Sequence, residues 1–124
     1  MADALNGAVL DTNIVLYALR GELDEALPAV GARVSVITEI ELLGYPGLAA
    51  NDESAVRSLL SMLDVVPLTE AVKEEAISLK RRLNLRLPDA VILATAAVTG
   101  SELLTNDRDL AGKATVACRS LRLR

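Results

Sequence analysis

Several carboxylates of this 124-residue chain stand where a short apolar segment ends or where an apolar helix begins. They are Asp11, Glu39, Glu41, Asp89, Asp107 and Asp109. A charge at the end of a core strand is costly unless it caps a helix or binds a partner. Three or four carboxylates in one partly buried cleft would repel each other, and protonation or a bound cation would relieve that repulsion. The pattern predicts a site for Mg²⁺ or Mn²⁺, which prefer oxygen ligands and can activate a water for attack on phosphorus.

The composition excludes other common kinds of catalytic site. The chain has no histidine and a single cysteine, Cys118. It therefore holds no Ser-His-Asp or Cys-His site and no zinc site built from histidines or thiolates. The longest apolar run is too short to cross a bilayer, and the polar lead-in Met1–Gly7 does not resemble a secretory signal. The lone cysteine, expected as a small core residue, agrees with a reducing compartment, so we expect a cytoplasmic protein.

Strand and helix patterns alternate along the chain. Short apolar or β-branched segments predict strands over residues 8–10, 33–38, 64–68, 102–105 and 115–118. Apolar spacing predicts helices over residues 12–20, 39–43, 52–63, 69–83 and 88–99, with a short one possible within 22–31. Asp52 is a candidate cap, and Pro67 places the third strand at a sheet edge. This alternation predicts a single α/β domain whose parallel sheet carries helices on both faces.

All the acids fall on one edge of that predicted sheet. Ligands of such sheets bind beyond the carboxyl ends of the strands, where the strand order switches. Glu39 and Glu41 are two positions apart on a helix, so they cannot both face the site. Asp11 alone would be interpreted as a helix cap, but the convergence of other acids makes it a metal ligand. We then expect Thr12 or Asn13 to be the cap and the first strand to be central.

Three stretches of the chain resemble the PIN-domain ribonucleases of the VapC toxin type. They run from Val9 to Tyr17, from Ser35 to Gly44, and from Pro88 to Ala96 continuing through Leu103–Leu110. They occur in the family's order and extend over nearly the whole chain. The resemblance implies a single three-layer α/β/α PIN-like domain over residues 1–124, with a central parallel sheet of four to five strands. It also implies an Mg²⁺- or Mn²⁺-dependent endoribonuclease.

The resemblance assigns roles residue by residue. The implied catalytic and metal-binding acids are Asp11, Glu41, Asp89 and Asp107, with Glu41 rather than Glu39 as the family's glutamate. Residues implied to orient ligands or water, or to stand at the periphery, are Thr12, Asn13, Thr105 and Asp109. The sequence departs from the family at Leu110, where an aromatic is common, and between Gly44 and Asp52, where relatives often carry a longer helical arm.

Partners also follow from the resemblance. It implies an RNA substrate, a homodimer, and a small antitoxin whose arginine could pair with the acids. The best candidates for RNA contact are Lys80, Arg81, Arg82 and Arg86, and the second group is Arg119, Arg122 and Arg124. A solvated helix face or tail accounts for both groups equally well. The net charge of −4 argues against a general nucleic-acid-binding surface but permits a local one.

Three alternatives share parts of this pattern. An aspartyl phosphatase of the haloacid dehalogenase type needs Asp-x-Asp, and Asn13 stands at the second position. A receiver-like signalling domain needs an aspartate after the third strand and a lysine after the last, and residues 67–69 and 115–124 supply neither. Both are therefore disfavoured. A housekeeping RNA-processing nuclease of the same fold stays open, because the sequence does not separate it from a toxin.

Overall fold

Five short parallel strands form the centre of the fold in the computed structural model, which describes residues 7–124. The strands are β1 (Ala8–Leu10), β2 (Ala32–Ser35), β3 (Asp64–Val66), β4 (Glu102–Leu104) and β5 (Cys118–Arg119). Their order across the sheet is β3-β2-β1-β4-β5, and every neighbouring pair is parallel. As predicted, β1 is central and β3 lies at an edge. The strand order switches at β1, so the space beyond β1 and β4 is the expected ligand position.

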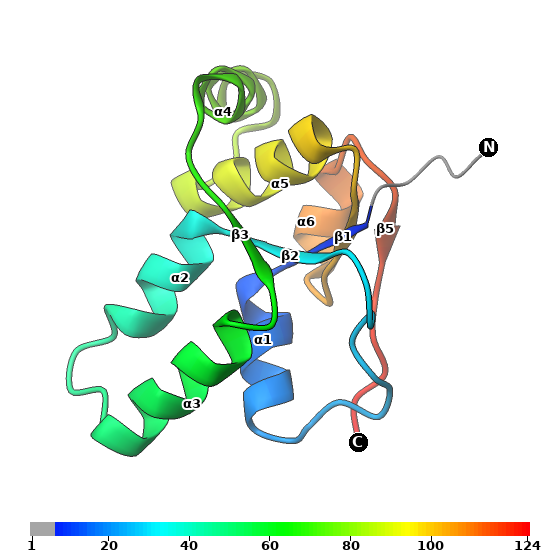
Figure 1. Cartoon of the computed structure of the whole chain (residues 1–124). Helices are drawn as coiled ribbons and strands as arrows, with labels where there is room; N and C mark the ends of the chain where they lie inside the picture. Colours follow the sequence, from blue (N-terminus) through cyan, green and yellow to red (C-terminus); the bar gives the residue numbers. More distant parts are fainter. Residues whose placement is uncertain (1–6) are drawn as a thin grey trace.

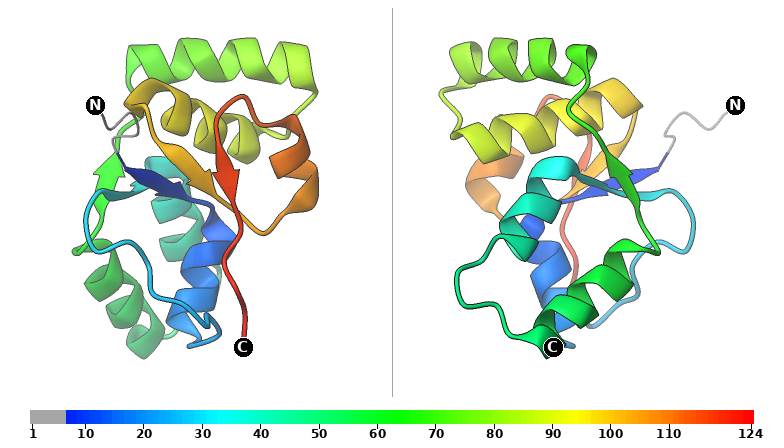
Figure 2. Two further views of the ribbon diagram at one scale, coloured as in Figure 1. Left: turned by 90° about the vertical axis from the view of Figure 1, so that its right-hand side faces the viewer. Right: turned by 60° about the vertical axis from the view of Figure 1, so that its left-hand side comes forward.

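Helices cover both faces of this sheet (Figures 1 and 2). They are α1 (Thr12–Leu19), α2 (Val36–Leu43), α3 (Ala50–Leu60), α4 (Glu70–Leu83), α5 (Leu87–Thr99) and α6 (Arg108–Lys113). One hydrophobic core joins the sheet to α4, α5 and α6, and a second joins it to α1, α2 and α3. The predicted three-layer α/β/α class is confirmed, with α4 packed outside α5 (Figure 2).

The helix α5 is the buried element that the sequence predicts. Residues 90–96 are all buried, which explains why this helix is apolar on nearly every side. Pro88 stands in its first turn, where a missing N–H costs nothing. Gly100 ends the helix with a φ of 66°, a left-handed conformation that glycine adopts without strain. The helix therefore positions Asp89, in its first turn, beside the carboxyl ends of the strands.

Two helix starts differ from the sequence prediction. The second strand ends at Ser35 rather than Thr38, because the Ser35 side chain accepts a hydrogen bond from the Ile37 N–H and begins α2 there. Asp52 does not cap α3. That helix begins after Ala49, which makes no side-chain cap bond, and Asp52 lies in the first turn.

The C-terminal part of the chain also differs from its prediction. The last strand lies at residues 118–119 instead of 115–118. No helix forms within residues 22–31. Leu23 instead makes an antiparallel bridge to Leu123, and Leu121 is 3% exposed. The predicted basic tail is thus packed against the domain, and Cys118 is partly buried against the core.

All residues of the predicted lead-in Met1–Gly7 except Gly7 lie outside the described residues, so the prediction for it is not tested. Among residues 7–124, no helix combines the length and the apolar character needed to cross a membrane.

Candidate active site

Asp11 stands where β1 ends and α1 begins. It is 6% exposed, and one of its carboxylate oxygens accepts a hydrogen bond from the Thr12 N–H at 2.8 Å. Asp11 is therefore the N-cap of α1, and the prediction that Thr12 or Asn13 takes this role is wrong. Its φ and ψ of −62° and 152° are those of an extended residue, as the cap position requires. Capping and membership of an acidic site do not exclude each other here.

The environment of Asp11 disfavours its charged form. Burial is the largest influence and raises the pKa of the Asp11 carboxyl. Hydrogen bonds from Thr105 and Thr12 oppose this rise, and the nearby negative charges of Asp89 and Asp107 add to it. A cation bound here would stabilise the carboxylate form against all of these unfavourable influences.

Thr105 connects Asp11 to Asp107. Its buried hydroxyl donates to Asp11 Oδ2 at 2.7 Å and accepts from the Asp107 N–H at 3.0 Å. Asp107 is in turn held by its own helix start, because its Oδ1 accepts from the N–H groups of Asp109 and Leu110 at the beginning of α6. The loop after β4 thus fixes the position of Asp107 relative to Asp11.

Glu41 reaches the site through a second threonine. The Thr12 hydroxyl donates to Glu41 Oε1 at 2.8 Å and therefore accepts from the Thr38 hydroxyl at 2.9 Å. Thr38 is fully buried, and it lies three residues before Glu41 on the same face of α2. The sequence prediction missed Thr38, although its spacing from Glu41 could have identified it. Glu39 makes no side-chain hydrogen bond or ion pair within the described chain.

Asp89 is paired with a cation in the structure. Arg86, the residue before α5, donates from Nε and Nη2 to Asp89 Oδ2, each at 3.2 Å. Hydrogen bonding to Asp89 is the largest influence on the Arg86 guanidinium and raises its pKa. The negative charges of Asp89, Asp107 and Glu41 raise this pKa further. The Arg86 side chain is 78% exposed. The residue expected to contact RNA therefore faces the predicted acids and neutralises one of them.

The four acids are arranged around the carboxyl ends of β1 and β4, but they are not a preassembled metal site. Among residues 7–124, no group of three or more acidic or thiol side chains is placed to hold a metal ion. Each acid has a protein partner instead, as described above. The donor set, made of carboxylate and hydroxyl oxygens, nevertheless matches the chemistry of a hard cation. Coordination by Asp89 requires its release from Arg86.

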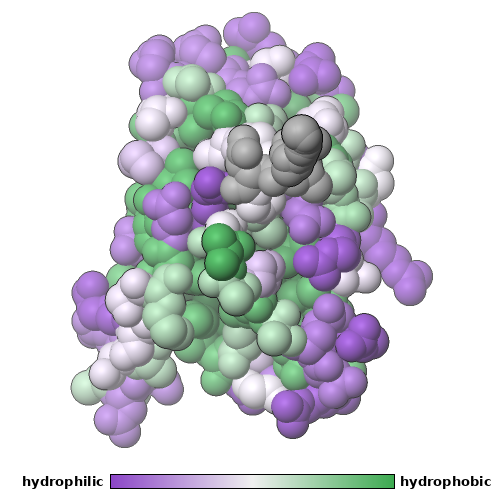
Figure 3. All heavy atoms as spheres, turned by 45° about the vertical axis from the view of Figure 1, so that its right-hand side comes forward, coloured by the Kyte–Doolittle hydropathy of each residue, from purple (hydrophilic) through white to green (hydrophobic). Residues whose placement is uncertain are grey.

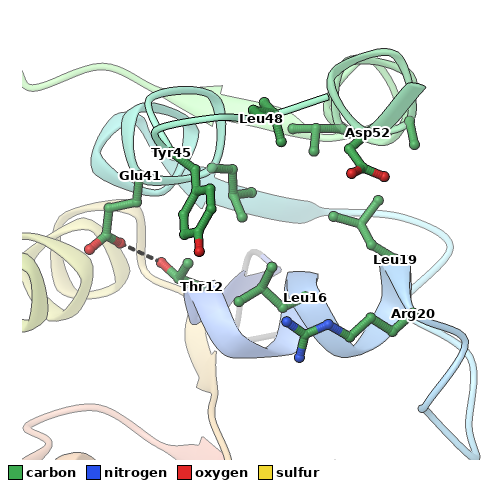
Figure 4. A pocket seen from close by; sticks show the side chains of 11 residues that line it. Thr12, Leu16, Leu19, Arg20, Glu41, Tyr45, Leu48 and Asp52 are labelled. Atoms are coloured by element: carbon green, nitrogen blue, oxygen red, sulfur yellow. Dashed lines mark hydrogen bonds between the residues drawn. The ribbon is translucent and has the colours of Figure 1, made fainter. Parts of the chain in front are cut away.

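Two cavities border this row of acids, one on each side. The α1–α3 cavity has a volume of about 530 Å³ and lies between α1, α2 and α3 (Figure 4). Thr12 and Glu41 form its end nearest the acids, and apolar side chains together with Tyr45 form most of its wall. The α6 cavity has a volume of about 550 Å³ and includes Thr105 and Asp107. Both cavities are large enough for part of a ligand.

The other predicted residues make no side-chain hydrogen bond or ion pair with the four acids within residues 7–124. Asn13 is exposed and makes no side-chain hydrogen bond within the described residues, so it orients nothing in this structure. Asp109 is exposed and forms an ion pair with Lys113 at 3.6 Å, and its peripheral role in the site stays a prediction. Lys80, Arg81 and Arg82 are exposed near the end of α4, in a layer separated from the sheet by α5. Figure 3 shows a hydrophilic surface at the top of the molecule, where α4 lies.

Comparison with known proteins identifies the family to which this fold belongs. The model of the PIN domain matches residues 8–115. The chain belongs to the PIN-domain family. Its four predicted acids are all in the matched region, and no curated protein matches the sequence significantly.

Solved structures similar to this PIN domain include several toxin–antitoxin complexes. A chain of a toxin–antitoxin complex from Klebsiella pneumoniae is 32% identical, with a TM-score of 0.71 over 86% of this chain and 92% of that one. A chain of the DNA-bound VapBC complex from Salmonella typhimurium has a TM-score of 0.80 at 16% identity, covering 94% and 98%. A chain of the VapBC-5 structure from Mycobacterium tuberculosis has a TM-score of 0.68 at 23% identity, over 94% of this chain and 98% of that one. The last two show the fold alone.

Proposed function

We propose that this PIN domain is a metal-dependent endoribonuclease and the toxin of a toxin–antitoxin pair. The observation that carries the proposal is the convergence of Asp11, Glu41, Asp89 and Asp107 at the carboxyl ends of the central strands of a PIN domain. Similarity to a toxin–antitoxin complex at 32% identity supports the toxin role over a housekeeping nuclease. We expect it to act on RNA in the cytoplasm.

The four acids would hold Mg²⁺ or Mn²⁺, with Asp11 as the central ligand. Such an ion supplies a water of lowered pKa and stabilises negative charge on a phosphate. The chain's own residues orient the carboxylates: Thr105 fixes Asp11, and Thr12 fixes Glu41. The burial of Asp11 keeps bulk water away from this carboxylate. Arg86 would leave Asp89 when the ion binds and would then be free to contact a phosphate oxygen.

The antitoxin would occupy the α1–α3 cavity. Leu16 and Leu19 of α1 and Leu48 of the α2–α3 connection provide an apolar wall, which suits an apolar helix or strand of a protein partner (Figure 4). Arg20 and Asp52 line the same cavity, and neither has an ion-pair partner within the described residues. Because the cavity ends at Glu41, a bound segment would reach the acids and block RNA. A homodimer stays a prediction, which the molar mass in solution tests.

Cleavage of RNA tests the enzymatic part of the proposal. Purified protein is incubated with a single-stranded RNA in Mg²⁺, in Mn²⁺ and in EDTA. We expect cleavage only with the metal ions, and a loss of about 100-fold or more in Asp11→Asn, because a ligand should matter at least as much as its supporting residues. Asp24→Asn, at an exposed aspartate that lines neither cavity, is the matched control and should retain activity. Cleavage in EDTA, or full activity of Asp11→Asn, would contradict the proposal.

Growth tests the toxin part separately. Expression of the wild-type chain should arrest growth, Asp11→Asn should not, and a small protein encoded next to this gene should restore growth. A chain that cuts RNA in vitro but has no such neighbour and no effect on growth would be a housekeeping nuclease.

A further inference from the structure

We propose that the α6 cavity binds the nucleotide next to the cleaved phosphate, with Tyr17 against its base and Arg108 on its phosphate. This inference rests on the proposed ribonuclease function and assigns that reaction a substrate subsite. It predicts that an RNA strand leaves the acids on the α6 side, and that the protein binds a flanking nucleotide there.

The cavity is continuous with the acids. Asp107 and Thr105 line it, and Thr105 is the residue whose hydroxyl donates to Asp11. A strand whose phosphate lies at Asp11 and Asp107 therefore has its neighbouring nucleotide at the mouth of this cavity. Its volume of about 550 Å³ is within the range of ligand pockets in proteins, so it has room for a nucleotide.

The cavity also carries positive charge in an otherwise acidic protein. Arg108 lines it, is exposed, and makes no side-chain hydrogen bond or ion pair with any residue in 7–124. Arg119 lines it as well, and its contacts with Glu25 and Glu102 are long, at 3.7 and 3.5 Å. An unpaired guanidinium adjacent to Asp107 is suited to a phosphate, which it can bind with two parallel hydrogen bonds. It would offset the repulsion between the acids and the RNA backbone.

An aromatic and apolar wall completes the subsite. Tyr17, Leu121 and Leu123 line the cavity from α1 and from the C-terminal segment. The chain has only two aromatic residues, so a tyrosine in a cavity beside the acids is a specific feature. Stacking on an aromatic ring binds any base, because every base has a π-face. The subsite should therefore favour single-stranded RNA with little preference among bases.

The alternative basic surface on α4 lacks these features. Lys80, Arg81 and Arg82 line neither of the two cavities that border the acids, and Arg82 is hydrogen-bonded to Ser78 at 3.2 Å. The chain's two tyrosines line the two cavities and not this surface. Arg82 is therefore a matched control for Arg108: both are exposed helix arginines, but only Arg108 lies beside an acid of the site.

Fluorescence anisotropy with a labelled single-stranded RNA of mixed sequence tests the subsite. The full chain carries Asp11→Asn so that the RNA stays intact. We expect Arg108→Ala to weaken binding about fivefold and to reduce the slope of log K against log salt by about 0.7. Tyr17→Leu should weaken binding about tenfold, whereas Tyr17→Phe keeps the ring and binds like the parent. Arg82→Ala should change affinity less than about twofold.

Photocrosslinking gives a second measurement that needs no substitution of Tyr17. RNA containing 5-iodouridine is irradiated with the protein, and we expect the adduct on the peptide that contains Tyr17. Unchanged binding by Arg108→Ala and Tyr17→Leu, a larger effect of Arg82→Ala, or adducts only on α4 would overturn the subsite. If the wild-type chain cleaves RNA in these cases, the ribonuclease proposal survives. If it neither binds nor cleaves RNA with metal present, both proposals fail.

Discussion

The two cavities beside the acids have nearly the same volume but opposite chemistry. The α1–α3 cavity is walled mainly by apolar side chains, with leucines from α1, α2 and the α2–α3 connection, and its charges Arg20 and Asp52 have opposite signs. The α6 cavity is formed by α1, the loop after β4, the start of α6 and the C-terminal segment, and two arginines line it. Each contains one of the chain's two tyrosines, Tyr45 or Tyr17. The difference supports the proposal that the same four acids face two kinds of ligand, an apolar protein segment and a polyanion.

A charge placed in the apolar cavity should separate the two ligands most clearly. Leu48→Asp should weaken binding of the antitoxin about 30-fold or more, because a carboxylate would be buried without a partner. RNA cleavage by the free protein should stay within about threefold, and Arg108→Ala should show the reverse pattern. Titration calorimetry and cleavage assays measure the two effects. Met62→Asp, which places the same charge at a residue that is 74% exposed outside the cavity, is the control.

Each of the two cavities contains a threonine that is hydrogen-bonded to one of the acids. Thr105→Val removes a buried hydrogen bond to Asp11 and should lower the cleavage rate about tenfold. Thr12→Val removes the hydrogen bond to the exposed Glu41 and should lower the cleavage rate less than Thr105→Val does. Single-turnover cleavage at saturating metal compares them. Equal losses, or a larger loss for Thr12→Val, would mean that Asp11 is not the central acid.

Arg86 should compete with the metal ion for Asp89. Arg86→Ala should therefore bind Mn²⁺ about threefold more tightly than the wild type, a modest gain because the ion pair is exposed. Electron paramagnetic resonance of free Mn²⁺ measures this affinity without RNA. Arg82→Ala should leave it unchanged. Weaker Mn²⁺ binding in Arg86→Ala would show instead that Arg86 helps to hold the site in place.

The smallest effect concerns stability in the absence of metal. Since burial raises the pKa of Asp11, the folded chain binds a proton there more tightly than the unfolded chain does. The stabilisation of the folded chain by this proton is therefore present at pH values below the pKa of Asp11 in the unfolded chain. It is lost as the pH rises through the higher pKa of Asp11 in the folded chain. Asp11→Asn should melt at a higher temperature than the wild type at neutral pH in EDTA.

This difference should shrink as the pH falls towards the ordinary pKa of aspartate. Thermal unfolding at a series of pH values measures it. Asp109→Asn is the control and should melt close to the wild type, because its ion pair is exposed. A lower melting temperature for Asp11→Asn at neutral pH would contradict the account of Asp11.

The α1–α3 side of the molecule was largely predictable from the sequence. Apolar spacing marks helices, and acids directly after strands mark the binding edge of a parallel sheet, so the position of Asp11 follows from local pattern. The choice of Glu41 over Glu39 follows instead from the resemblance to PIN-domain ribonucleases. The start of α2 was placed too late, because β-branched residues after Ser35 suit a strand as well as a helix. The hydrogen bond that the Ser35 side chain accepts from the Ile37 N–H starts the helix at this point, and sequence spacing alone does not reveal this bond.

The α6 side was less predictable, because its walls come from segments far apart in the sequence. Asn106 bonds the backbone of Leu121 in both directions, which brings the C-terminal segment beside the loop after β4. A basic tail carries no periodic signal for such packing. The pairing of Arg86 with Asp89 was missed for a different reason: in the sequence, Arg86 follows a run of cations and shares their interpretation as a surface group.

Asp11, Glu41, Asp89 and Asp107 are proposed to form a cation site. Anomalous diffraction from a crystal of the wild-type protein grown with Mn²⁺ tests it most directly. The account predicts a manganese peak in contact with the Asp11 carboxylate, with Arg86 no longer bonded to Asp89. A peak elsewhere on the surface, or no peak at these four acids at saturating Mn²⁺, would contradict it.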